Sequence, residues 1–293
     1  MRELMARRRR AGVPADLWIK CRKCGAMHYR PEFEAGLRVC TQCEYHDRLS
    51  AGQRLDLLLD DPSSFEELNV GVVSADPLGF SRPSGSYPDR LEKARVATGR
   101  SEAVVCGVGE IQGHSVAVGI MEFGFIGGSM GGAVGERITR LFELSYDDCL
   151  PLVIVTASGG ARQDEGLFAL MQMVKTTAAA VRLAKARVPF IVVMADPTLA
   201  GVTASFASLA DVIVGEPGAT IRFAGSRVVQ GTLSRRARAE DHTSEWVLRH
   251  GMIDMVVPRR DQRRTIGRLI ELLAPGRETA CVHPADSAAA LSV

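Results

Sequence analysis

The chain has 293 residues, of which 46% are hydrophobic and 24% are charged. This composition is typical of a soluble globular protein, and the length suits one large domain with or without a small one. The formal net charge of +2 gives no general argument for binding to nucleic acid or to a membrane. We expect no transmembrane helix, because no run of about 18 uninterrupted apolar residues occurs. Seven cysteines are an odd number, which argues against a complete disulfide framework and favours a cytoplasmic protein.

The N-terminal segment, residues 1–16, is strongly basic and contains four consecutive arginines, Arg7–Arg10. A charge run of this kind is typical of a solvated, disordered tail, and we predict such a tail here. A weak contact between these arginines and the phosphates of a nucleic acid is the alternative. We predict a second flexible tail over residues 278–293.

Two Cys-x-x-Cys pairs follow the basic segment. Cys21 and Cys24 form the first pair, Cys40 and Cys43 form the second, and 15 residues separate them. Each pair makes a turn that points two thiolates to one side, so two turns supply four ligands for a tetrahedral zinc ion. Because sulfur takes all four positions, the site is structural. We therefore predict a zinc ribbon over residues 17–50, whose folding depends on the metal.

A zinc ribbon beside an arginine run also suits a nucleic-acid-binding protein, which is the alternative from a different functional class. Against it, Arg30 and Arg38 in the ribbon are offset by nearby glutamates. His28 and His46 lie close to the cysteines, and we predict that both are surface residues rather than metal ligands.

From residue 51 the sequence takes on the pattern of an α/β domain, which we place over residues 51–277. The elements predicted in chain order are a short helix and turn within 54–68, a Gly/Pro/Ser-rich loop at 77–90, a helix that ends on Gly99, a hairpin over 103–123 that turns at Gly113-His114, a glycine-dense loop at 124–132, a helix at 133–148, a strand at 152–156, a helix that ends near 185, a strand at 188–196, a loop and helix at 197–210, and short strands within 211–217 and 219–225. Alternating elements with continuous apolar strands predict a parallel sheet covered by helices.

Three loops of this domain carry glycine directly after strand-like segments. They are GGSMGG (127–132), SGGAR (158–162) and DPTLAG (196–201). In parallel α/β sheets, ligands bind at the carboxyl ends of the strands. Glycine lets backbone N–H groups approach a ligand closely, and such groups can form an oxyanion hole. The loops match neither a GxGxxG motif nor a P-loop, so we do not predict nucleotide binding.

Charged residues follow the glycines of SGGAR. Arg162 is expected to orient the loop or to contact a phosphate group of a ligand, and a salt bridge to Asp164 or Glu165 is the structural alternative. Asp164 and Glu165 stand at the start of the predicted helix, where the helix dipole favours carboxylates. We predict this structural role for both residues rather than acid–base catalysis.

Several motifs occur in a fixed order along the chain. After the two cysteine pairs come FIGGSMG (125–131), SGGAR (158–162), MQMVKT (171–176), DPTLAGVTASF (196–206), FAGSR (223–227) and GMIDMVV (251–257). In this combination the sequence resembles the β subunit of the acetyl-CoA carboxylase carboxyltransferase. The resemblance covers residues 17–275 approximately, and it implies a crotonase-like α/β fold behind the zinc ribbon.

The resemblance also implies partners and a reaction. A separate α subunit would complete an α2β2 heterotetramer, and a biotin carboxyl carrier protein would deliver carboxybiotin. The enolate of acetyl-CoA would take up CO2 to give malonyl-CoA, and the backbone amides of Gly159 and Gly160 would hold the thioester oxygen. The residues expected to bind the acyl-CoA substrate are Gly127, Gly128, Ser129, Met130, Gly131, Arg162 and Gly201.

The chain departs from the family pattern at Gln163-Asp164, at Ala200, at Ser226 and in the segment 237–243. These changes leave Gly159 and Gly160 in place. A paralogue that acts on another acyl thioester, or that decarboxylates a malonyl thioester, is therefore the alternative to acetyl-CoA carboxylation.

Overall fold

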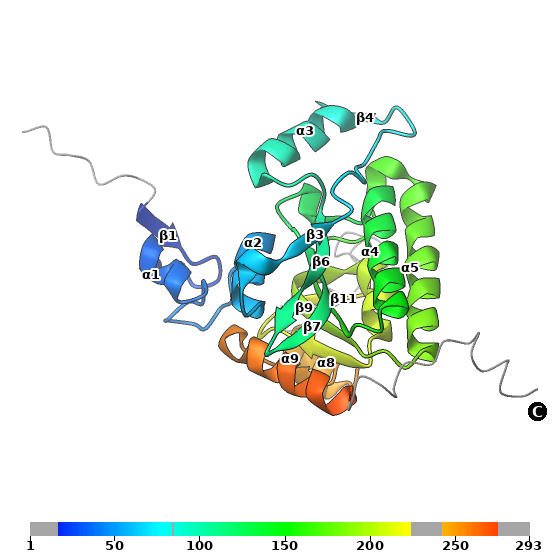
Figure 1. The fold of residues 1–293 in the computed structure, drawn as a ribbon. Helices are drawn as coiled ribbons and strands as arrows, with labels where there is room; N and C mark the ends of the chain where they lie inside the picture. The colour runs from blue at the N-terminus through cyan, green and yellow to red at the C-terminus, as the bar shows by residue number, and fades with distance from the viewer. Residues whose placement is uncertain (1–16, 84, 224–241, 275–293) are drawn as a thin grey trace, which may run out of the picture. The chain divides into compact units, whose positions relative to one another are not determined.

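The computed structural model describes residues 17–83, 85–223 and 242–274. The two predicted tails, Ser226 and most of the segment 237–243 lie outside these residues. The chain divides into two compact units, Met1–Leu49 and Ser50–Val293, and each is considered separately (Figure 1).

The first unit is small. Strand β1 (Trp18–Lys20) pairs antiparallel with β2 (Met27–Tyr29), and helix α1 (Arg30–Ala35) follows directly. Phe33 is buried inside this unit, and its ring stacks on that of His28 with the centroids 4.9 Å apart. One two-stranded ribbon and one short helix bury too little apolar surface to fold alone, so a metal ion has to supply the missing stability.

A twisted sheet forms the centre of the second unit, with the strand order β12-β10-β9-β8-β7-β6-β3 and with β11 paired to β9. Its strands are β3 (Glu66–Leu68), β6 (Val104–Ile111), β7 (His114–Met121), β8 (Leu152–Ser158), β9 (Phe190–Leu199), β10 (Val212–Gly215), β11 (Ile221–Arg222) and β12 (Met255–Val256). The pairings from β7 to β12 are parallel, as predicted. The edge is antiparallel, because β6 and β7 form the hairpin predicted around Gly113 and β3 adds to β6.

Helices cover both faces of this sheet. They are α2 (Ala51–Leu58), α3 (Tyr87–Thr98), α4 (Gly132–Asp147), α5 (Leu167–Lys185), α6 (Ala200–Thr203), α8 (Ser244–Arg249) and α9 (Arg259–Leu273), with short 3-10 turns η2 (Pro62–Ser64), η3 (Ile126–Gly128), η4 (Gln163–Glu165) and η5 (Phe206–Leu209). Neighbouring residues of β8 point to opposite faces: Ile154 belongs to the buried cluster that includes residues of α3, α4, α5 and α8, and Val155 to the cluster that includes residues of α2 and α9. Helices α4 and α5 run side by side on one face (Figure 1).

Two predicted helices are interrupted. The helix expected directly after SGGAR is split by Gly166, which has φ 54° and ψ −126°, so α5 begins only at Leu167. Backbone angles of this kind favour glycine. Asp164 and Glu165 therefore lie in the separate turn η4 rather than in the first turn of α5, and that prediction was wrong. The helix expected within 197–210 is likewise divided into α6 and η5.

Candidate functional site

The four cysteines of the first unit form one cluster. Their Sγ atoms lie within 4.8 Å of one another, with Cys21 and Cys43 3.7 Å apart and Cys24 and Cys40 3.6 Å apart. With Zn–S bonds of about 2.3 Å, two sulfurs of a tetrahedral site are separated by about 3.8 Å. The cluster therefore fits Zn²⁺ with little adjustment, and its four sulfurs leave no coordination position for a substrate.

The two histidines near the cysteines are not the surface residues that we predicted. The Nε2 atom of His28 lies 3.2 Å from the Sγ atom of Cys40, and His46 is buried, with Nδ1 3.0 Å from the carbonyl oxygen of Glu44. An N–H group beside a metal-bound thiolate stabilises its negative charge. His28 thus stabilises the zinc site from beside it, and the four ligands remain the cysteine sulfurs.

In the second unit the three predicted loops converge. The Met130 N–H donates to the Gly160 oxygen at 2.9 Å, and the Arg162 N–H donates to the Met130 oxygen at 2.9 Å. The third loop lies against the second, since a Cβ built on Gly160 would be 2.8 Å from the Cβ of Ala200. Gly201 is packed just as closely, with its Cβ position 3.1 Å from the Ala161 nitrogen.

The two amides expected to hold the thioester oxygen have different roles in this arrangement. The Gly159 N–H donates to the Gly127 oxygen at 2.8 Å, so it ties the first loop to the second. The Gly160 N–H donates to the Ser158 hydroxyl at 3.0 Å. A hydroxyl can rotate away from its donor, whereas a backbone carbonyl cannot. We therefore revise the predicted pair: Gly160 is the candidate oxyanion donor, and Gly159 joins the loops.

Most of GGSMGG faces the interior of the chain. A Cβ on Gly128 would be 1.9 Å from the Ala157 oxygen, and one on Gly131 would be 2.3 Å from the Glu165 carboxylate. The side chains of Ser129 and Met130 are buried. The substrate contacts predicted at Ser129 and Met130 would therefore have to come from their backbone rather than from their side chains. The buried side chains shape the loop.

Gly127 differs from the other residues of this loop. It has φ +66°, and its Cβ position has no atom within 4 Å. This glycine provides the turn that lets its own carbonyl reach Gly159. Among the predicted contacts in GGSMGG, the Gly127 position is the one that opens toward free space.

The predicted contact between Arg162 and a CoA phosphate is also not supported, because the Arg162 side chain is fully buried. Its guanidinium donates to Glu102 at 2.6 Å and to the Ser129 hydroxyl at 3.1 Å, and it lies 3.6 Å from Glu165. Burial opposes the ionisation of Glu102, but the charge of Arg162 outweighs it and holds the pKa of Glu102 below its usual value. Arg162 thus orients the loop, which was one of the two expected roles, and its ion pair with Glu165 is the salt bridge given as the structural alternative.

Glu165 is buried below the same loops. Its carboxylate accepts hydrogen bonds from the Gly132 N–H, from the Tyr87 hydroxyl and, at 3.1 Å, from the Ser74 hydroxyl. Burial and this carboxylate raise the pKa of Tyr87 to about 12, so the phenol stays protonated and donates. A carboxylate at a helix N-terminus was predicted, but the helix is α4 rather than α5.

Asp164 points the other way and binds two arginines. Its Oδ1 atom lies 2.9 Å from Nε of Arg82 and also pairs with Arg90. Arg82 belongs to β4 (Ser81–Arg82), which pairs with β5 (Gly85–Ser86), and Arg90 belongs to α3. The departure from the family pattern at Asp164 therefore fastens the β4–β5 hairpin to the turn that follows SGGAR.

Comparisons with known proteins agree with this arrangement. Residues 48–274 match the carboxyl transferase domain family, and residues 18–43 match the acetyl-CoA carboxylase zinc finger domain. The acetyl-coenzyme A carboxylase carboxyl transferase subunit beta 2 of Roseiflexus sp. (strain RS-1) is 45% identical over 290 residues, which cover 96% of each chain.

Two solved structures share the fold. Transcarboxylase 12S aligns with a TM-score of 0.64 and 26% identity over 76% of this chain and 40% of its own. A chain of a Pseudomonas malonate decarboxylase hetero-dimer aligns with a TM-score of 0.59 and 22% identity over 75% of this chain and 85% of its own. The four-sulfur cluster, the crotonase-like sheet and the converging glycine loops thus occur together in one chain, which belongs to the family of acetyl-CoA carboxylase carboxyl transferase β subunits.

Proposed function

We propose that this chain is the β subunit that binds acetyl-CoA and stabilises its enolate during carboxyl transfer to give malonyl-CoA. The observation that carries the proposal is the convergence of the three loops on Gly160 in a chain of this family. Carboxybiotin on a separate carrier protein supplies CO2 and, after its release, the base that removes the α proton. The α carbon of the enolate then forms the new bond to CO2.

The chain's own contribution is the Gly160 N–H. In the structure this donor is held by the Ser158 hydroxyl at 3.0 Å, and the thioester oxygen would replace the hydroxyl as acceptor. The charge on that oxygen grows as the α proton leaves, so a fixed donor stabilises the transition state more than the ground state. One such donor is worth roughly 3–4 kcal/mol.

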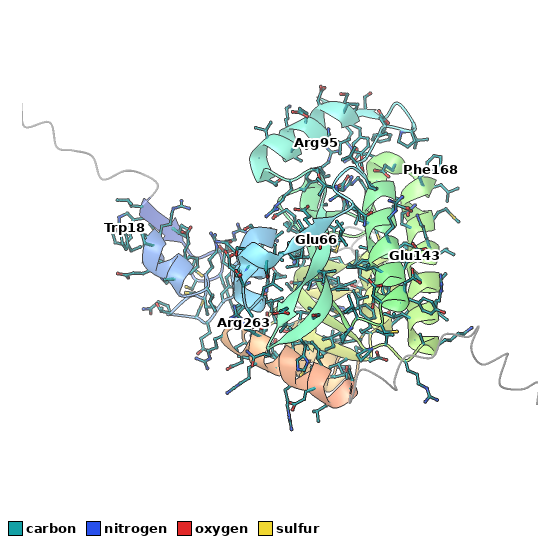
Figure 2. All side chains as sticks on the ribbon, in the orientation of Figure 1. Trp18, Glu66, Arg95, Glu143, Phe168 and Arg263 are labelled. Carbon is teal, nitrogen blue, oxygen red and sulfur yellow. The ribbon has the colours of Figure 1, made fainter. Side chains whose placement is uncertain are left out.

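An exposed apolar stripe on α5 supports assembly with a partner. Five apolar side chains on one side of the helix are between 45% and 69% exposed, namely Leu167, Leu170, Met171, Val174 and Val181. Phe168, labelled in Figure 2, projects from the same helix. Contiguous exposed apolar side chains mark interaction sites. By length and composition alone α5 could also cross a membrane, but it packs along α4.

The occupant that fits the stripe is the α subunit of the complex. This chain spans 40% of the transcarboxylase 12S chain but 85% of a chain from the malonate decarboxylase hetero-dimer. Relatives therefore carry further sequence either in the same chain or in a partner. The stripe starts at Leu167, directly after the SGGAR turn. A subunit bound there reaches the loops, consistent with an α2β2 complex in the cytoplasm that also receives the carrier protein.

A related acyl thioester is the second candidate substrate, and the Asp164 contacts favour it. The β4–β5 hairpin held by Arg82 lies against the turn that follows SGGAR, and Leu78 before it would be 3.0 Å from a Cβ on Gly166. A wall of this kind near the loops can limit the size of the acyl group. Nothing in the described residues favours the nucleic-acid-binding alternative, and Arg7–Arg10 lie outside them.

The test uses the complex obtained by co-expression of this chain with the α subunit. It measures the transfer of the carboxyl group from malonyl-CoA to biotin. Gly160→Ala adds a Cβ to a residue at φ +106° and displaces the donor, so we expect kcat to fall about 100-fold or more. The matched control is Gly113→Ala, at φ +74° with open space at the hairpin tip, which should keep full activity. Equal activities of the two variants, or no transfer by the wild-type complex, would overturn the proposal.

A further inference from the structure

Glu165 takes no part in the proposed chemistry, yet the residue is only 3% exposed and both oxygens of its carboxylate accept hydrogen bonds. One oxygen accepts the N–H of Gly132, the first residue of α4. The other accepts the hydroxyls of Tyr87 and Ser74, which come from α3 and from the segment before β4. A buried carboxylate with this set of donors is stable only in one orientation.

The GGSMGG loop is shaped around this carboxylate. A Cβ on Gly131 would lie 2.3 Å from Oε1 of Glu165, and a Cβ on Gly132 would lie 3.4 Å from Oε2. Any other residue at Gly131 would push the carboxylate off the N-terminus of α4. The last two glycines of the motif therefore make room for Glu165.

Glu165 is also linked to the donor residue by a short path. Arg162, three residues earlier, binds the first loop twice. Its backbone N–H donates to the Met130 oxygen, and its guanidinium donates to the Ser129 carbonyl. Met130 in turn holds the Gly160 carbonyl at 2.9 Å. The peptide that carries the Gly160 N–H thus lies between two hydrogen bonds, one from the Gly159 N–H to the Gly127 oxygen and one from the Met130 N–H to the Gly160 oxygen. Glu165 holds Gly132, two residues after Met130, and so fixes the loop that supplies the second of these bonds.

We propose that Glu165 is a positioning residue for carboxyl transfer, which fixes the direction of the Gly160 N–H by fastening the start of α4 to the SGGAR turn. It does not touch the substrate. The proposal rests on the proposed function for its assay. A displacement of about 1 Å in a catalytic group costs about 100-fold in rate, so a loosened fastening affects kcat before it affects binding.

The kinetic test uses Glu165→Ala in the assembled complex. We expect kcat to fall about 30-fold while KM for malonyl-CoA stays within about 3-fold, because the donor acts on the transition state. Glu165→Gln keeps the shape and one acceptor, and it should recover most of the lost kcat. Glu136→Ala is the matched control, since Glu136 lies on the same helix α4 but is partly exposed and pairs with Lys175 and Arg140. This variant should keep the wild-type rate.

A second measurement separates positioning from turnover. The carbonyl stretch of ¹³C-labelled acetyl-CoA should move to lower frequency on binding to the wild-type complex, and Glu165→Ala should lose at least half of this shift. A wild-type complex that shows the shift without turnover would refute the proposed reaction and leave the positioning role standing.

Three results would overturn the positioning role: no shift in the wild type, a full shift with unchanged kcat in folded Glu165→Ala, or a change confined to KM. If Glu165→Ala does not fold, Tyr87→Phe takes its place, because it removes one hydroxyl donor to Glu165 and keeps the ring. An intermediate loss of both kcat and shift supports the proposal, and wild-type values for both refute it.

Discussion

Replacing Glu216 by Gln tests the buried ion cluster at the carboxyl end of β10. The Glu216 carboxylate bonds Arg54 of α2, with Nη2 to Oε2 at 2.8 Å, and Arg259 of α9, with Nε to Oε1 at 2.9 Å. Gln262 donates to the same Oε1 at 3.0 Å. The side chains of Arg54, Glu216 and Arg259 are 4%, 1% and 1% exposed. The carboxylate therefore joins two helices on one face of the sheet.

The magnitude follows from the burial. Glu216→Gln keeps the volume but leaves two buried guanidinium groups without their counter-charge, and losing one partner of a buried ion pair costs about 3–5 kcal/mol. In a domain of this size each kcal/mol lowers Tm by about 2–4 °C. We therefore expect Tm to fall by roughly 6–20 °C.

The assay is thermal unfolding of the full chain, followed by circular dichroism. Glu136→Gln is the control, because Glu136 also pairs with two cations but its side chain is 31% exposed. An exposed pair contributes about 0–1 kcal/mol, so its Tm should fall by less than about 4 °C. Equal losses in the two variants would refute the argument that burial decides the cost.

The same carboxyl gives a pH dependence whose sign is fixed. Burial opposes its ionisation, but Arg54 and Arg259 outweigh burial and hold the pKa of Glu216 far below its usual value. Because the pKa of Glu216 is lower in the folded state than in the unfolded chain, where it is about 4.3, its ionised carboxylate stabilises the fold at pH values above about 4.3. This contribution is lost as the pH falls below that value. The stability gap between the wild type and Glu216→Gln should therefore narrow on acidification below about pH 4. A stability difference between the two proteins that does not change with pH would contradict the lowered pKa of Glu216.

Three further predictions concern the other features. Cys24→Ser should abolish zinc binding, measured by mass spectrometry, and leave the thermal transition of the second unit unchanged; retained stoichiometric zinc would refute the four-sulfur site. Asp164→Asn leaves Arg82 and Arg90 without their carboxylate, so the kcat/KM for propionyl-CoA relative to that for acetyl-CoA should change at least about 5-fold. An unchanged ratio would contradict the proposal that the β4–β5 hairpin limits the size of the acyl group. Val174→Asp, in the α5 stripe, should prevent co-purification with the α subunit without lowering Tm; an intact complex would rule out this surface.

Local patterns predicted much of the molecule. The cysteine spacing gave the metal cluster, the period of two around Gly113 gave the β6–β7 hairpin, and the apolar runs gave β8 and β9. Each of these features depends on residues close together in the sequence. A periodic pattern does not show where a helix breaks, so the division at Gly166 was missed even though Gly166 is visible in the sequence.

The buried network below the loops could not be predicted in the same way. Arg162 and Glu102 are 60 residues apart, and Ser74 lies 88 residues from Arg162. A single Glu before a strand, or a single Ser in a loop, has no distinctive spacing. These residues become recognisable only after the fold has brought them together in a place where an unpaired charge would be costly.

The glycines show why a motif indicates a site more reliably than it assigns the roles within it. A glycine reports that a Cβ has no room or that φ is positive, and it does not report what occupies the space. At Gly128 the space is taken by the Ala157 carbonyl, and at Gly131 by the carboxylate of Glu165, which follows the second motif by three residues. GGSMGG and SGGAR therefore constrain each other through Glu165, and both motifs are needed to aim one amide, that of Gly160. The same reasoning explains why Asp164 can differ from the family pattern: it binds the β4–β5 hairpin and takes no part in the contact between Glu165 and the start of α4.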